Sequence, residues 1–141
     1  MKGILLISHG KMAEGLADSA ALFFGDEIAQ MEYLCLREGD SSDEFGEKIG
    51  DAVCRIDSGE GVIILADLYG GTPCNQAIPL LKDGIELISG MNLGIVVQLL
   101  SGREYGSVDP DALVESGRGC ITNVKKALAE AQQESKGDWF N

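Results

Sequence analysis

Residues 3–10 read Gly3-Ile4-Leu5-Leu6-Ile7-Ser8-His9-Gly10, a short apolar run that ends on the only histidine of the 141-residue chain. A second apolar run, Val62-Ile63-Ile64-Leu65-Ala66, ends in the same way on Asp67. Short continuous runs of aliphatic residues are typical of strands that are buried on both faces of a parallel sheet. We therefore expect two central parallel strands, each ending on a residue capable of acid–base chemistry.

The composition is that of one globular domain. The chain contains 45% hydrophobic and 24% charged residues, which is usual for a protein with its own hydrophobic core. Its net charge of −12 comes without a basic tract, so we expect neither nucleic acid nor a membrane surface as a partner. No apolar run is long enough for a signal-peptide core or a membrane span, which predicts a cytoplasmic protein.

The four cysteines do not form a metal-binding pattern. No two of them have the two-residue spacing typical of zinc sites, and a single histidine adds few further ligands. We therefore expect free thiols, with no metal and no cofactor. The cysteines are Cys35, Cys54, Cys74 and Cys120.

Helical and strand-like patterns alternate along the chain. Apolar residues with helical spacing predict a helix over residues 11–24, and the capping box Ser41-x-x-Glu44 begins a second helix that extends to Ile56. Thr72 and Pro73 suit the N-cap and first position of a third helix to about residue 81, and Asn92 can cap a fourth. Two further strands are predicted at residues 28–36, as an edge strand, and 85–89.

The pattern is less regular after Asp109. Residues 111–116 have a helical pattern, residues 121–128 resume it, and a strand near Cys120 is an alternative interpretation. We expect one domain over residues 1–131 and a loosely ordered C-terminal tail over residues 132–141.

These units predict an open α/β fold with a mostly parallel, flavodoxin-like sheet of strand order 2-1-3-4 and helices on both faces. Ligands of such sheets bind at the carboxyl ends of the strands, where the strand order switches between the first and third strands. His9 and Asp67 end those two strands. We therefore expect them to form one site.

A histidine–aspartate pair can carry a phosphoryl group. Asp67 can hold one ring nitrogen of His9 while the other nitrogen attacks phosphorus and forms a covalent intermediate. The backbone amides of Gly70, Gly71 and Thr72, with the Thr72 hydroxyl, precede a predicted helix and can hold phosphoryl oxygens. The chain has no Walker-type lysine and no dinucleotide glycine fingerprint, so ATP is not expected as the direct donor.

Four segments match the pattern of a known family. They are residues 3–10 with Ala13-Glu14-Gly15-Leu16 and Ser19-Ala20, residues 66–75, residues 88–93, and residues 115–119. In this order, and over nearly the whole chain, they resemble the IIA domain of the mannose-type sugar phosphotransferase system.

The resemblance implies a phosphotransferase component. His9 would accept a phosphoryl group from the histidine phosphocarrier HPr and pass it to a IIB component, with Asp67 orienting the histidine. The sugar is phosphorylated only later, during transport by the membrane subunits IIC and IID, which the chain would meet indirectly. The resemblance also implies a homodimer with exchanged C-terminal segments, and it covers systems for mannose, fructose, sorbose and amino sugars.

The chain departs from the family pattern near the expected site. The family often has Pro-Met at Gly94-Ile95 and glutamate at Gln98, and phenylalanine is common at Cys74. We expect these departures to affect the specificity for partner and sugar. The residues expected to line the rim of the site that faces partners are Gly10, Tyr69, Cys74, Asn75, Asn92 and Leu93.

Three other functions stay open. A non-catalytic signalling module of receiver type would need an acidic cluster after the first strand, where this chain has Ser8-His9-Gly10. A hydrolase with Asp67 as its nucleophile would keep a phosphoryl group on Asp67 after the change His9→Ala. A regulator would bind partners without being phosphorylated, and a transfer assay separates it from a carrier.

Overall fold

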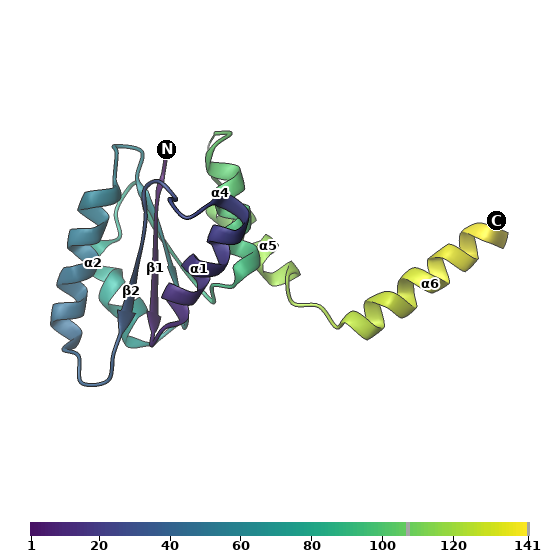
Figure 1. Cartoon of the computed structure of the whole chain (residues 1–141), viewed down its shortest axis with the longest axis horizontal. Helices are drawn as coiled ribbons and strands as arrows, with labels where there is room; N and C mark the ends of the chain where they lie inside the picture. Colours follow the sequence, from purple (N-terminus) through teal and green to yellow (C-terminus); the bar gives the residue numbers. More distant parts are fainter. Residues whose placement is uncertain (107, 141) are drawn as a thin grey trace.

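The chain forms an open α/β sheet with helices on both faces (Figure 1). The computed structural model describes residues 1–106 and 108–140, with side chains up to residue 135. The strands are β1 (Gly3–His9), β2 (Met31–Leu36), β3 (Val62–Ala66) and β4 (Ile85–Ser89). The helices are α1 (Met12–Phe24), α2 (Ser42–Ile56), α3 (Thr72–Ala77), the short 3-10 helix η1 (Ile78–Leu80), α4 (Leu93–Arg103), α5 (Pro110–Gly119) and α6 (Val124–Phe140). Within the described ranges, no helix combines the length and the apolar character needed to cross a bilayer.

The four strands are parallel and lie in the order β2-β1-β3-β4, which confirms the predicted order. β1 and β3 are neighbours, and Ile7 pairs with Ala66 near their carboxyl ends. β2 pairs with β1 alone and is partly exposed, as expected for an edge strand. His9 lies two residues beyond Ile7, and Asp67 lies one residue beyond Ala66. The register therefore brings both residues to the same edge of the sheet.

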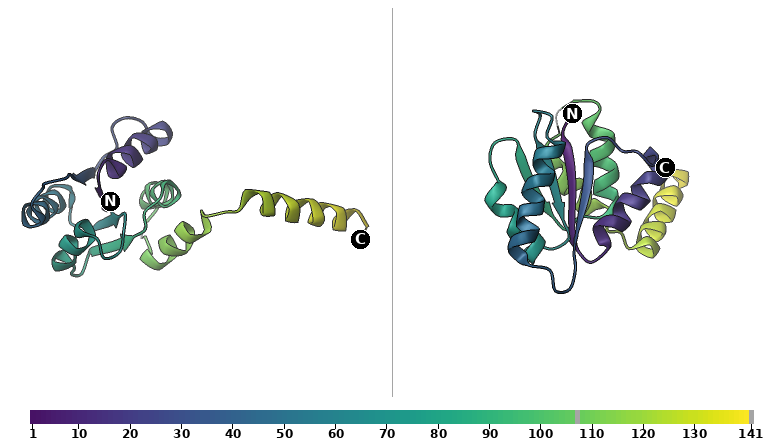
Figure 2. Two further views of the ribbon diagram at one scale, coloured as in Figure 1. Left: turned by 90° about the horizontal axis from the view of Figure 1, so that it is seen from below. Right: turned by 60° about the vertical axis from the view of Figure 1, so that its left-hand side comes forward.

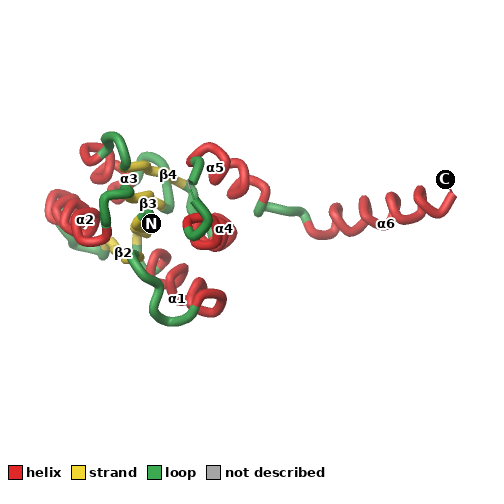
Figure 3. The backbone as a smooth tube through the Cα atoms, turned by 90° about the horizontal axis from the view of Figure 1, so that it is seen from above, coloured by secondary structure: helices red, strands yellow, loops and turns green. Residues whose placement is uncertain are grey.

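Helices lie on both faces of the sheet (Figure 3), and the alternation of side chains along β1 divides the core into two layers. Ile4 and Leu6 belong to the layer under α1, α4 and α5, whereas Leu5 and Ile7 belong to the layer under α2 and α3. All four side chains are fully buried. A central strand with helices on both faces needs such a continuous apolar run, which explains why the sequence signal at residues 4–7 is strong.

Two of the predicted helix caps are confirmed and one is wrong. The Ser41 hydroxyl accepts a hydrogen bond from the amide of Glu44, and the Asn92 side chain accepts one from the amide of Ile95. Thr72, however, is the first residue of α3, and Gly71 is its N-cap. The helix also ends earlier than expected, because the chain tightens into η1 from Ile78 to Leu80.

The C-terminal third is helical in the described residues. Cys120 caps the end of α5, so the alternative of a strand at this position is not formed in the described part of the chain. Residues 132–140 lie within α6, which projects from the body of the molecule (Figures 1 and 2), and the loosely ordered tail expected over residues 132–141 stays a prediction. Asn141 lies outside the described residues, and the domain limit at residue 131 stays a prediction.

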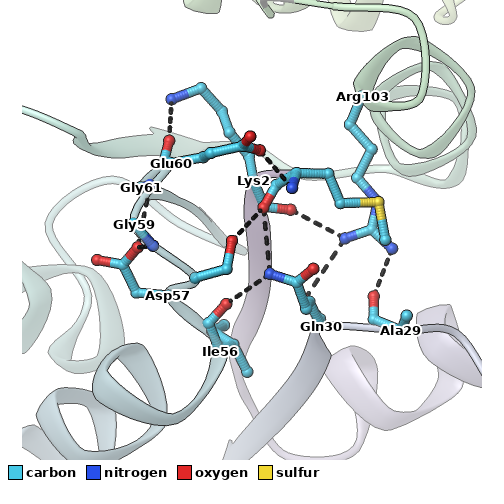
Figure 4. A network of polar contacts seen from close by, with 11 residues as sticks. Lys2, Ala29, Gln30, Ile56, Asp57, Gly59, Glu60, Gly61 and Arg103 are labelled. Atoms are coloured by element: carbon cyan, nitrogen blue, oxygen red, sulfur yellow. Dashed lines mark hydrogen bonds and ion pairs between the residues drawn. The ribbon is translucent and has the colours of Figure 1, made fainter.

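A buried arginine joins the end of α4 to the amino ends of β1 and β2 (Figure 4). The Arg103 guanidinium donates to the carbonyl oxygens of Lys2, at 3.0 Å, and Ala29, and the residue is 6% exposed. Burial lowers the pKa of Arg103, while the nearby Glu104 carboxylate raises it. The guanidinium thus satisfies carbonyl groups of the loops at this end of the sheet.

We expect Arg103→Met to destabilise the fold by about 2 kcal/mol, because the partly buried carbonyl groups lose a charged donor. Chemical denaturation of the variant measures this loss. Arg55→Met is the matched control, since Arg55 pairs with Glu32 on the surface, where ion pairs contribute little. Equal shifts of the two unfolding midpoints would contradict the role assigned to Arg103.

Candidate functional site

His9 and Asp67 form a hydrogen-bonded pair at the carboxyl edge of the sheet, as the sequence predicted. One carboxylate oxygen of Asp67, Oδ2, lies 2.8 Å from Nδ1 of the His9 ring and 2.9 Å from the His9 backbone nitrogen. The other oxygen, Oδ1, accepts a hydrogen bond of 2.9 Å from the amide of Leu68. Both the ring and the backbone of His9 are therefore fixed to Asp67.

These contacts keep Asp67 ionised. Burial alone would raise the pKa of its carboxyl group, whose side chain is 9% exposed. The hydrogen bonds from the His9 amide, the His9 ring and the Leu68 amide outweigh burial and lower the pKa below its ordinary value. Asp67 is a carboxylate at neutral pH and can only accept hydrogen bonds.

The carboxylate determines which nitrogen of His9 is free. Because Asp67 accepts at Nδ1, a neutral His9 ring carries its proton there and leaves a lone pair on Nε2. The His9 side chain is 45% exposed, whereas that of Asp67 is almost buried. The pair therefore presents a nucleophilic nitrogen at the surface with an anion behind it.

Gly71 lies against the edge of the imidazole ring. A Cβ atom placed on this residue would come within 2.6 Å of Cε1 and 3.3 Å of Nε2 of His9. Neighbouring Gly70 has a φ of +85°, a conformation that glycine adopts without strain. The pair of glycines thus lets the chain before α3 approach the ring, with the half-buried Thr72 next in sequence.

We expect Gly71→Ala to slow the phosphoryl transfer that the resemblance implies for His9 roughly tenfold to a hundredfold, because the new methyl group displaces the ring from its position. The backbone of Gly71 has a φ of −82°, which alanine adopts readily, so the effect reports on the ring. A single-turnover measurement with phosphorylated HPr, the donor that the resemblance implies, gives the rate. Gly102→Ala, which meets no atom within 4 Å, is the control and should keep the wild-type rate. Equal rates in the two variants would contradict the role of Gly71.

The expected rim residues have different surroundings. Tyr69 is 87% exposed, and Gly10 and Leu93 are half-buried. Asn75 is exposed, and its side chain donates to the Gly70 carbonyl, which braces the glycine turn. Asn92 caps α4 and also donates to the carbonyl of Gly117.

Cys74 does not lie on the rim. It is 2% exposed and packs in the core layer under α2 and α3, because α3 turns this side chain toward the sheet. The glycine at residue 94, where the family often has proline, is explained by a close contact. A Cβ atom at residue 94 would overlap the Cys120 sulfur, so glycine leaves room for the end of α5.

Two residues at the site were missed by the sequence reasoning. The buried Ser8 hydroxyl contacts the turn that follows His9, and the exposed Leu68 donates its amide to Asp67. Ser8 had a usable signal, because it is the single polar side chain inside an otherwise apolar run. Leu68 had none, because its contribution comes from the backbone.

The fold and the site define an open parallel α/β protein with an aspartate-anchored histidine at its strand-order switch. Residues 3–115 match the family described as EIIA-man, PTS system fructose IIA component. The chain therefore belongs to the mannose-type family of IIA components of the sugar phosphotransferase system.

Individual relatives agree with this family. The chain is similar to the PTS system mannose-specific EIIAB component of Escherichia coli (strain K12), with 29% identity over 135 residues that cover 90% of the chain. It spans 41% of the length of that relative. The PTS system fructose-specific EIIA component of Bacillus subtilis (strain 168) is 28% identical over 107 residues, which cover 74% of this chain and 73% of that protein.

Solved structures share the architecture. The PTS IIA protein associated with the fucose utilization operon from Streptococcus pneumoniae superposes with a TM-score of 0.83 and 31% identity, covering 90% of this chain and 96% of that one. The mannose/sorbose specific IIA subunit from Enterococcus faecalis has a TM-score of 0.74 and 25% identity, covering 87% and 95% of the two chains.

Proposed function

We propose that this chain is a phosphohistidine carrier that accepts a phosphoryl group on Nε2 of His9. The observation that carries the proposal is the geometry of the pair, in which Asp67 holds Nδ1 and leaves Nε2 at the surface. Membership of the IIA family supplies the chemical context, because IIA components are parts of a sugar phosphotransferase system. The donor is phosphorylated HPr and the acceptor is a IIB component.

The transfer step balances without a proton leaving the ring. The lone pair of Nε2 forms a bond to phosphorus as the bond between phosphorus and the donor nitrogen of HPr breaks. The His9 ring then carries a proton on Nδ1 and a phosphoryl group on Nε2, so it gains positive charge. Asp67, 2.8 Å from Nδ1, stabilises that charge.

The amides of Gly70, Gly71 and Thr72 are the proposed contacts for the phosphoryl oxygens. Gly71 lies against the edge of the reacting ring, and Thr72 adds a hydroxyl at the start of α3. Backbone amides at this type of turn offer fixed donors where negative charge gathers. The exposed Tyr69 and the half-buried Gly10 are next in sequence to Gly70 and to His9, and they suit contacts with HPr or IIB.

The remaining steps lie outside this chain. In the proposed scheme IIB passes the group on, and the sugar is phosphorylated at the membrane subunits IIC and IID. The proposal places the chain in the cytoplasm, a compartment in which the four free cysteines stay reduced.

The geometry argues against the hydrolase alternative. A nucleophilic aspartate needs a free and accessible oxygen, whereas Oδ2 of Asp67 contacts His9 twice and Oδ1 contacts Leu68. The side chain is also 9% exposed. Asp67 is thus placed to orient His9 rather than to attack phosphorus.

The direct test is the intact mass of the chain after incubation with phosphoenolpyruvate, enzyme I and HPr. We expect one added phosphoryl group that is labile to acid, as expected of a phosphoramidate. A folded wild-type chain with no added mass would overturn the proposal and favour a regulatory or signalling module that binds partners without phosphorylation.

The homodimer is a further part of the proposal, and the exposed C-terminal segment supports it. Every described side chain from Arg118 to Ser135 is exposed, including the apolar Ile121 and Leu128. Helix α6 projects from the body (Figure 2), whereas most of the stability of a helix in a protein comes from tertiary packing. A second copy of the chain would cover this helix.

We expect light scattering to give a molar mass for the full chain that is twice its 15.0 kDa monomer mass. The double change Val124→Glu and Leu128→Glu should shift it toward the monomer, because both side chains are exposed apolar groups near the start of α6. Lys125→Glu alters charge at the same turn and should leave the dimer intact. A wild-type chain that stays monomeric at all concentrations would contradict the dimer.

A further inference from the structure

Ser8 is buried at the point where β1 ends and the His9 turn begins. Its side chain is 0% exposed, and among the described residues only Arg103 shares with it the combination of a polar side chain and burial. The Ser8 hydroxyl oxygen accepts a hydrogen bond of 2.8 Å from the amide of Ala13. The same hydroxyl donates to the carbonyl oxygen of Gly10 at 3.1 Å.

The contact with Ala13 replaces a helix cap. Lys11 stands at the N-cap position of α1, but its side chain makes no capping hydrogen bond. Ala13 is the second residue of α1, so its amide is one of the donors that a helix start leaves without an intrahelical partner. Ser8 supplies that acceptor from the end of the preceding strand and ties β1 directly to α1.

The contact with Gly10 closes the turn around His9. Gly10 has a φ of +56°, and its amide donates to the carbonyl of Leu36 in β2 at 2.8 Å. The His9 amide donates to Asp67 on the opposite side. The Ser8 hydroxyl thus binds the Gly10 carbonyl of this turn. The two amides of the same turn, those of His9 and Gly10, donate to Asp67 and to β2.

We propose that Ser8 is a positioning residue for phosphoryl transfer at His9. Its hydroxyl fixes residues 9–13 as one rigid turn, so that Nδ1 of the ring stays on Asp67 and Nε2 stays toward the donor. This inference rests on the proposed carrier function and names a residue that acts through His9. A merely structural serine would affect stability alone, so the test separates the two effects.

The test compares Ser8→Ala with Ser41→Ala. Both changes remove a hydroxyl that accepts from a helix amide, at 2.8 Å for Ala13 and 3.2 Å for Glu44, but Ser41 belongs to the start of α2. Single-turnover transfer is measured at saturating phosphorylated HPr, together with the KM for phosphorylated HPr. We expect Ser8→Ala to slow the saturated rate about tenfold or more, with a much smaller change in KM, because misplaced reacting groups lose rate. Ser41→Ala should keep the wild-type rate.

A second readout does not depend on transfer. Nitrogen-15 spectra of the His9 ring, which is the single histidine, report the fraction of the tautomer protonated on Nδ1. We expect this form to dominate in the wild type and in Ser41→Ala, and to fall in Ser8→Ala. A wild-type chain that accepts no phosphoryl group would contradict the proposed function. The spectra would still show whether Ser8 positions the His9 ring.

Two outcomes with Ser8→Ala would overturn the inference. One is a folded Ser8→Ala protein with the wild-type rate and the wild-type ring spectrum. The other is an equal loss of rate in Ser8→Ala and Ser41→Ala, which would show a general effect of helix capping. If Ser8→Ala does not fold, Ser8→Cys serves in its place, since a thiol nearly matches the volume but accepts hydrogen bonds weakly. A folded Ser8→Cys protein with the wild-type rate would likewise overturn the inference.

Discussion

Replacement of His9 by alanine is expected to give a folded chain that takes up no phosphoryl group from HPr. The chain contains one histidine, so no other imidazole can form a phosphoramidate. The side chain is 45% exposed and its removal leaves no large cavity, so the fold should persist. Intact mass after incubation with phosphoenolpyruvate, enzyme I and HPr measures the uptake, and circular dichroism verifies the fold.

Ser41→Ala is a suitable control, since Ser41 lies at the start of α2 and should not affect uptake. The informative failure would be a phosphoryl group that persists on His9→Ala. Its stability in acid and base would then show whether an aspartate such as Asp67 carries it. That result would identify a carboxylate, and not the His9 ring, as the nucleophile, and it would support the hydrolase alternative.

Asp67→Asn is expected to slow transfer to His9 on the order of a hundredfold to a thousandfold, even though the side-chain shape is kept. The asparagine amide removes the negative charge that stabilises the phosphorylated ring. It can also donate to Nδ1, which would shift the ring proton to Nε2 and block the attacking lone pair. Single-turnover transfer from phosphorylated HPr measures the rate. A rate within a few-fold of wild type would show that the contact of 2.8 Å is structural.

The stability of Asp67→Asn relative to the wild type is expected to depend on pH. Because the folded pKa of Asp67 lies below its ordinary value, the ionised group stabilises the folded state above about pH 4. That contribution is lost as the pH falls through the lowered pKa. The difference in unfolding free energy between wild type and Asp67→Asn should therefore shrink on acidification. A difference that does not change with pH would contradict the lowered pKa.

The sheet and the reacting pair were predictable from sequence for one physical reason. Strands buried on both faces must be continuously apolar, so the runs before Ser8 and Asp67 identified β1 and β3. The strand order is the one expected of a flavodoxin-like sheet, and it brings His9 and Asp67 together at the switch between β1 and β3. The resemblance to the IIA family added the proposed direction of phosphoryl transfer.

Other features depend on tertiary contacts that no local pattern encodes. Thr72 has good N-cap chemistry, but the glycine turn that meets the His9 ring places Gly71 in that position. Cys74 is expected on the rim because it departs from the family pattern near the site, yet α3 turns this side chain into the core. The amide of Ala13 at the start of α1 is capped by Ser8, which lies three residues before the N-cap position. Sequence rules for capping consider the N-cap residue itself, so they do not predict this contact.

The most direct measurement locates the phosphoryl group on the phosphorylated protein by phosphorus and nitrogen-15 NMR of the single histidine. The geometry predicts a bond from phosphorus to Nε2 of His9, with the proton kept on Nδ1 beside Asp67. A phosphoryl group on Nδ1, which Asp67 occupies, or on any residue other than His9 would contradict the account.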